Sequence, residues 1–91
     1  MALYALGLCQ LEQGQAAEAS KQLEKAIRIN NRLPKINYYL GLAYGKMNKL
    51  VDAHYHFGIY YKRKGSLRNA QFHFQEALRL TDDPKEKEIL N

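Results

Sequence analysis

Apolar residues recur along the chain at the three- and four-residue spacing of one helix face, and no stretch alternates apolar and polar residues as a strand does. The pattern therefore predicts an all-α fold. Gly14 and Gly65 lie between helical stretches, where glycine can adopt the left-handed backbone that ends a helix, and Asn48 tolerates the same conformation. Pro34 and Pro84 suit the first turn of a helix. We expect five helices and a short C-terminal one, over residues 2–13, 16–30, 34–47, 50–64, 67–80 and 84–90.

The same residue types also recur along the chain at one constant separation, which is the separation of Gly7 from Gly41. Three sets of equivalent residues share this spacing: Leu6-Gly7 with Leu40-Gly41, Ala19 with Ala53, and Leu23 with Phe57. A repeat of this length corresponds to one supersecondary unit, which buries its apolar face against its neighbours. The small residues would let the two helices of a hairpin approach closely, and the large ones would fill the space beside them. We therefore expect a short α-solenoid of antiparallel helix hairpins.

These residues resemble the tetratricopeptide repeat, whose pattern is an aromatic residue, then Leu-Gly, then Tyr, and later Ala-x3-Phe. The two copies read Leu3-x2-Leu6-Gly7-x2-Gln10 with Ala19-x3-Leu23, and Asn37-x2-Leu40-Gly41-x2-Tyr44 with Ala53-x3-Phe57. The resemblance covers nearly the whole chain. It implies a protein-interaction scaffold that binds a peptide or partner segment and is not an enzyme by itself.

A third copy of the motif arrives half a period early. It reads Phe57-Gly58-x2-Tyr61 with Ala70-x3-Phe74, and its glycine follows Gly41 after only half the spacing that separates Gly7 from Gly41. The helix expected at 50–64 therefore ends one repeat and begins the next, which requires apolar or small residues on nearly all of its sides. We expect this helix to be a buried hinge at a half-repeat phase slip, with Phe57 and Gly58 almost fully buried.

The same stretch carries a narrower resemblance. Residues 54–65, together with Ala70, Phe74 and the run Glu76-Ala77-Leu78-Arg79-Leu80, are similar to the end of the tetratricopeptide tail of BepA-like zinc metalloproteases. This resemblance implies an accessory domain, residues 1–91, cut from a longer periplasmic or envelope-associated enzyme, where it positions unfolded substrates or docks on the catalytic domain. The His-Glu-x-x-His motif of that family is absent from this chain, so no protease residue carries over. Without this resemblance we expect a cytoplasmic protein.

The sequence offers little for catalysis, a cofactor or a metal. His54 and His56 are two positions apart, so on a helix they point in different directions and cannot bind one ion. Cys9 lies between Leu8 and Leu11 with no basic residue beside it, and we expect an inert, buried thiol. No apolar run reaches the roughly 18 residues of a transmembrane helix. We expect no catalytic residue, no cofactor and no metal site.

Charge is concentrated in the middle of the chain. Residues 28–68 hold nine basic residues and a single acidic one, Asp52, whereas both flanking segments are acidic. Lys62, Arg63 and Lys64 lie in the last turn of a helix, where cations face the negative end of the dipole favourably. Three interpretations stay open: a solvated helix end, a contact with an acidic protein or peptide, or a surface for nucleic acid or anionic lipid.

A line of aromatic and aliphatic residues is the main candidate for partner binding. In each copy a tyrosine precedes the Gly-containing pair, and an aliphatic residue lies four positions after that tyrosine. The three sets are Tyr4 and Leu8, Tyr38 and Leu42, and Tyr55 and Ile59. The tetratricopeptide resemblance implies that this line faces a concave groove. The predicted ligand is an apolar or aromatic segment with acidic flanks, and Lys35, Lys62 and Arg63 would form a basic rim. The alternative is that these residues simply pack in the core.

We also expect self-association through the terminal helices. A repeat array normally needs polar outer surfaces on its terminal repeats. Leu3, Leu6 and Leu11 in the first helix have no preceding repeat to cover them, and Ile89 and Leu90 lie at the other end. These apolar residues would favour a homo-oligomer.

Overall fold

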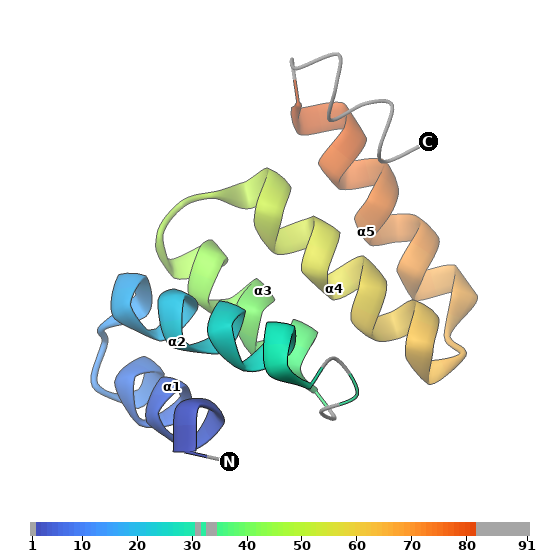
Figure 1. Cartoon of the computed structure of the whole chain (residues 1–91). Helices are drawn as coiled ribbons and strands as arrows, with labels where there is room; N and C mark the ends of the chain where they lie inside the picture. The colour runs from blue at the N-terminus through green and yellow to red at the C-terminus, as the bar shows by residue number, and fades with distance from the viewer. Residues whose placement is uncertain (1, 31, 33–34, 82–91) are drawn as a thin grey trace.

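The computed structural model describes residues 2–30, 32 and 35–81, and this part of the chain is all-α (Figure 1). Its helices are α1 (Ala2–Glu12), α2 (Ala16–Ile29), α3 (Ile36–Lys46), α4 (Leu50–Lys64) and α5 (Leu67–Leu80). The first five expected helices are thus confirmed, each within two residues at either end. The helix expected at 84–90 and the helix start expected at Pro34 lie outside the described residues.

Each helix packs against the next one along the chain, so the five form a row from α1 to α5 (Figure 1). A further contact joins α1 to α3, the first helices of two successive hairpins. Sequential packing of this kind confirms the expected short array of helix hairpins.

The three hairpin turns share one geometry. Gly14, Asn48 and Gly65 have φ values of 78°, 61° and 87°, which confirms the left-handed conformation expected for each. After each of them, a backbone amide donates to a carbonyl five residues earlier at 2.8–2.9 Å: Gln15 to Gln10, Lys49 to Tyr44, and Ser66 to Tyr61. This bond ends each preceding helix and fixes the direction of the next one.

Three contacts between helices explain why the motif has a glycine at this position. In each, a large side chain of one helix lies directly over a glycine of the preceding helix: Leu23 over Gly7, Phe57 over Gly41, and Phe74 over Gly58. A Cβ atom at these glycines would lie only 2.8, 2.8 and 2.6 Å from the covering side chain. The expected pairing of small and large residues is therefore confirmed in all three motif copies.

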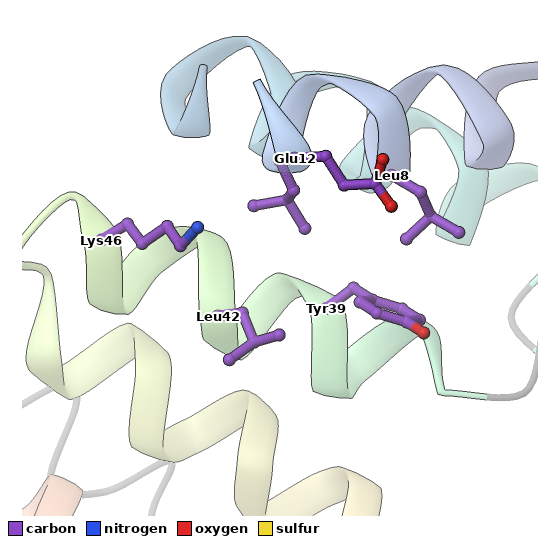
Figure 2. A pocket seen from close by; sticks show the side chains of 6 residues that line it. Leu8, Glu12, Tyr39, Leu42 and Lys46 are labelled. Atoms are coloured by element: carbon purple, nitrogen blue, oxygen red, sulfur yellow. The ribbon is translucent and has the colours of Figure 1, made fainter. Parts of the chain in front are cut away.

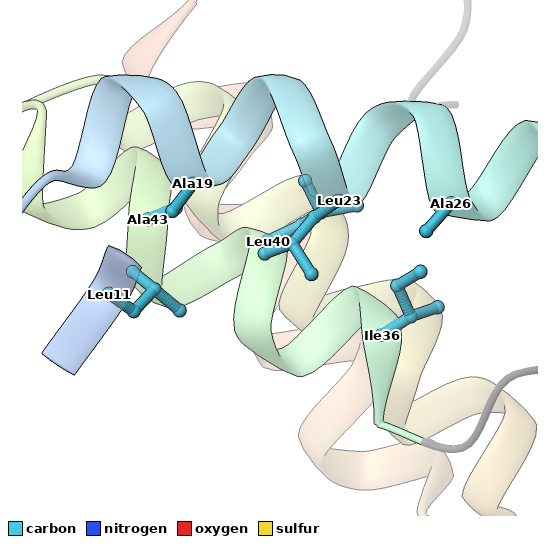
Figure 3. Packing of buried hydrophobic residues seen from close by; sticks show 7 residues of the cluster. All are labelled: Leu11, Ala19, Leu23, Ala26, Ile36, Leu40 and Ala43. Carbon is cyan, nitrogen blue, oxygen red and sulfur yellow. The ribbon is translucent and has the colours of Figure 1, made fainter. Parts of the chain in front are cut away.

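The core lies between α1, α2 and α3 (Figure 3). Its buried residues are Leu11, Ala19, Leu23, Ala26, Ile36, Leu40 and Ala43. Leu11 is only 6% exposed, so the prediction that it lacks a covering partner was wrong, because α2 and α3 already enclose it. Leu3 packs half-buried on the same cluster, whereas Leu6 is 44% exposed as expected.

α4 packs between α3 and α5, as the two overlapping motif copies predict. Gly58 is buried as expected, but Phe57 is only half-buried, so its predicted near-complete burial was wrong. The physical reason is that the Tyr38 and His73 rings, which flank the Phe57 ring where it lies over Gly41, are themselves half-buried, so Phe57 lies near the surface.

The burial predicted for Cys9 was also wrong, since this residue is exposed. Leu8 faces a pocket and Leu11 the core, so Cys9 falls on the outer side of α1. α1 has apolar residues on all sides, and the pattern alone therefore could not tell which side packs. Within the described residues no helix is long and apolar enough to cross a membrane.

Candidate functional site

A pocket of about 230 Å³ lies between α1 and α3 (Figure 2). We call it the α1–α3 pocket, and its lining residues are Leu8, Leu11, Glu12, Tyr39, Leu42 and Lys46. Figure 2 shows Leu8 and Glu12 on one side of it and Tyr39, Leu42 and Lys46 on the other. Its surface is mainly apolar, with one carboxylate and one ammonium group from Glu12 and Lys46.

The repeat itself explains why this pocket forms. Leu8 and Leu42 are one repeat period apart, and equivalent positions of the first helices of two hairpins lie side by side in a solenoid. The structure thus brings together two of the six residues predicted to form the groove. Tyr4 lies next to Tyr39, with ring centroids 6.1 Å apart. Burial and the neighbouring Tyr39 raise the pKa of Tyr4 above its usual value.

Tyr39 was not singled out from the sequence, although a signal for it exists. Leu42 follows Tyr39 after three positions and Lys46 follows it after seven, which is the spacing of residues on one helix face. The motif had selected Tyr38, the adjacent residue, which points to another interface. Its ring lies 5.6 Å from that of Phe57 and 5.3 Å from that of Tyr60, both on α4.

The remaining two predicted groove residues lie on α4. The Tyr55 ring contacts Phe74 of α5 at a centroid distance of 6.3 Å, and Ile59 is half-buried on the same helix. The six residues predicted to form one groove therefore lie in three different places: at the α1–α3 pocket, in the α3–α4 interface and on α4. The phase slip accounts for this division, because α4 packs on α3 as the second helix of a hairpin and not as the next first helix.

Aromatic rings nevertheless connect the helices. The residues Tyr4, Tyr39, Tyr38, Tyr60, Tyr61 and His73 follow one another with ring centroids 5.0–6.1 Å apart. We call this series the aromatic row. It runs from α1 through α3 and α4 to α5, and all of its members are half-buried. Such ring pairs add modest, geometry-dependent stability to the burial of apolar area.

A second pocket, of about 560 Å³, lies where the start of α3 meets the end of α4. We call it the basic pocket, and it is lined by Arg32, Lys35, Ile36, Asn37, Tyr60, Arg63 and Lys64. It gathers Lys35 and Arg63 of the predicted basic rim, together with two cations that the rim did not include. Lys62 is exposed and does not line this pocket.

A half-buried polar cluster ties α2, α3 and α4 together. The hydroxyl of Tyr44 donates to Glu24 at 2.9 Å, and the Tyr44 ring stacks on His56 with centroids 5.4 Å apart. Nδ1 of His56 lies 2.9 Å from Oδ1 of the buried Asn37, and its Nε2 lies 3.6 Å from Glu24. Burial lowers the pKa of His56, and the charges of Glu24 and Asp52 oppose that shift. The cluster satisfies polar groups between three helices, which is a packing role.

The other two histidines form a pair between α4 and α5. Nδ1 of His54 and Nδ1 of His73 lie 3.0 Å apart, so one of the two ring nitrogens donates a hydrogen bond to the other. Burial and the charge of His54 lower the pKa of His73. Within the described residues, no group of three or more His, Cys, Asp or Glu side chains could hold a metal ion.

Two repeat models match this chain. Residues 7–48 match a family described as TPR repeat, and residues 51–84 match one described as tetratricopeptide repeat. The second match starts at Val51, the second residue of α4, so it begins a repeat with α4, as the third motif copy does. Both matches concern the repeat, and neither concerns a zinc metalloprotease. No curated protein and no solved structure matches the chain.

Proposed function

Because the chain belongs to the tetratricopeptide repeat family, we propose that it is a protein-interaction scaffold whose α1–α3 pocket binds an apolar segment of a partner protein. The observation that carries this proposal is the pocket itself. It opens between two rigid helices, and Leu8, Tyr39 and Leu42 leave part of their apolar surface uncovered there.

The size of the pocket favours a side chain of a protein over a free small molecule. Its volume of about 230 Å³ is below the roughly 300–1,000 Å³ of sites that enclose drug-sized ligands. A single large apolar side chain fits such a space, and the rest of the partner segment would lie on the surface around it. Glu12 and Lys46 at the pocket could set the direction of that segment through its backbone dipoles or charged groups.

Selection from a library of 12-residue peptides displayed on phage would test this function. We expect the enriched peptides to share a large apolar residue, and we expect Leu42→Glu to weaken their binding at least tenfold, because it places a carboxylate in the pocket. Leu67→Glu is the matched control, since Leu67 is 64% exposed on α5 and lines none of the pockets described above. Absence of any enriched peptide, or equal binding by both variants, would contradict the proposal.

The same binding role suits the accessory domain of an envelope zinc metalloprotease. The similarity of residues 54–80 to the tail of BepA-like enzymes supports this second proposal. It predicts that the gene encodes a His-Glu-x-x-His motif ahead of these repeats, and sequencing the natural transcript would test it directly. A transcript that encodes only repeats would contradict it.

A further inference from the structure

We propose that the basic pocket binds acidic side chains of the same partner, next to the apolar segment in the α1–α3 pocket. This inference rests on the proposed function, because it describes a second part of that ligand. Charge complementarity carries it, together with the aromatic residues that connect the two pockets.

The basic pocket collects positive charge from three places in the chain. Arg32 comes from the connection between α2 and α3, Lys35 precedes α3, and Arg63 and Lys64 belong to the last turn of α4. None of the described residues that line it is acidic. Cations that surround one pocket repel one another, and an anion bound among them reduces that repulsion.

The start of α3 adds to this positive potential. The N-terminus of a helix carries a partial positive charge and amide groups without a helical partner. Lys35 is the N-cap residue of α3, and its side chain makes no capping hydrogen bond. A lysine side chain has no acceptor to offer these amides, whereas a carboxylate of a partner has two oxygen atoms.

Three tyrosines connect the basic pocket to the α1–α3 pocket. Tyr39 lines the α1–α3 pocket and Tyr60 lines the basic pocket, and Tyr38 lies between them with ring centroids 5.7 and 5.3 Å away. The Tyr39 and Tyr60 rings are therefore at most about 11 Å apart. An extended peptide covers that distance with roughly three residues, at about 3.3–3.6 Å each. The expected ligand thus carries acidic residues about three or more positions from its apolar anchor.

The aromatic environment of the basic pocket favours a peptide over single-stranded nucleic acid. Binding of unpaired bases uses exposed aromatic faces on which the bases stack. The pocket offers one aromatic ring, Tyr60, and Nζ of Lys64 lies 5.6 Å from its centroid. Tyr38 and Tyr61 pack against the same ring. A base that stacked on Tyr60 would therefore compete with Lys64 and with two neighbouring rings.

Titration with a hexaglutamate peptide at low salt, followed by amide NMR shifts, tests this inference. We expect shifts at Lys35, Asn37 and Arg63, and a loss of affinity as salt rises. Arg63→Glu and Lys35→Glu should each weaken binding at least fivefold. Lys62→Glu is the matched control, because it makes the same change of charge one residue away on α4 but outside the pocket. It should weaken binding less than twofold.

Three results would overturn the inference. The first is the absence of shifts at the pocket residues, and the second is an equal loss of affinity in Lys62→Glu and Arg63→Glu, which would mean that net charge alone attracts the peptide. The third is tighter binding of heptathymidylate than of hexaglutamate at the same residues, which would identify a nucleic-acid surface. Hexaglutamate has no apolar anchor, so none of these results tests apolar binding in the α1–α3 pocket. That proposal is tested separately by Leu42→Glu.

Discussion

The first three helices and the last two are stabilised in different ways. Between α1, α2 and α3, large side chains are fully enclosed, and Leu23, Ile36 and Leu40 have almost no exposed surface. In α4 and α5 the buried residues are all small: Ala53, Gly58, Ala70 and Ala77. These two helices also carry nine aromatic or histidine rings, and all of them except the exposed Phe72 are half-buried.

The difference follows from the number of helices that meet. α1 contacts both α2 and α3, so three helices surround a common centre. Among the described helices α5 packs mainly on α4, and two helices by themselves leave a large side chain between them partly uncovered. Flat rings suit this situation because they cover area and still make contacts at their edges. The array therefore has one closed core and one open aromatic interface.

The largest expected effect concerns the closed core. Leu23→Ala should lower the free energy of unfolding by about 2–5 kcal/mol, because a fully buried side chain is removed and the space over Gly7 is left empty. Phe57→Ala should cost less, about 1–2 kcal/mol, since the Phe57 ring is only half-buried. Urea unfolding followed by circular dichroism measures both. A larger loss for Phe57→Ala would contradict the distinction between the two regions.

The next effect concerns the glycines over which large residues lie. Gly41→Ala should lower stability by about 1–3 kcal/mol, because its Cβ would lie 2.8 Å from the Phe57 ring. Gly45→Ala, on the same helix, is the control, since its nearest neighbour is Ala53 at 3.9 Å. It should raise stability by up to about 1 kcal/mol, because alanine favours the helix. Thermal melts of the two variants should therefore shift in opposite directions.

The two regions should also differ in their response to acid. All three histidines lie in α4 and α5, and burial holds the pKa values of His56 and His73 below the ordinary 6.5. A lowered histidine pKa means that the unfolded chain binds more protons, so this stability is present above pH 6.5 and is lost as pH falls toward the folded values. Glu24 and Asp52 near His56, and Glu76 near His73, act against the loss, whereas the charge of His54 adds to it.

Hydrogen exchange at pH 7.5 and 5.5 measures that response. Amides of α4 and α5 should lose protection at pH 5.5 before those of α1–α3, and His73→Gln should reduce the change in α5. Equal loss of protection along all five helices would show that the histidines do not determine the acid response.

The smallest effect expected is weak self-association through the terminal helices. Leu6 on α1 is 44% exposed and Phe72 on α5 is 55% exposed, so apolar surface is available at both ends of the row. We expect dimers only near millimolar concentration, and Leu6→Glu should reduce them. Sedimentation of the parent as a strict monomer at that concentration would contradict this prediction.

The sequence by itself determined the helices, their turns and the small-over-large contacts between them. Each of these depends on one local requirement. Gly14 and Gly65 need only a left-handed backbone, and a motif glycine such as Gly41 needs only one large residue above it. The constant repeat period then places these requirements at equivalent positions along the chain, which is why helix boundaries and hairpin packing were predictable.

Only the tertiary structure decided which aromatic residues face a pocket and which face a helix. α1 and α3 carry apolar residues on all sides, so periodicity could not separate Tyr39 from Tyr38 or place Cys9 on the outside. The direction of Tyr55 was not predictable either, because the phase slip at α4 turns this side chain toward α5. The direction of a side chain on such helices is set by the neighbours that pack around it, and those neighbours come from distant parts of the chain.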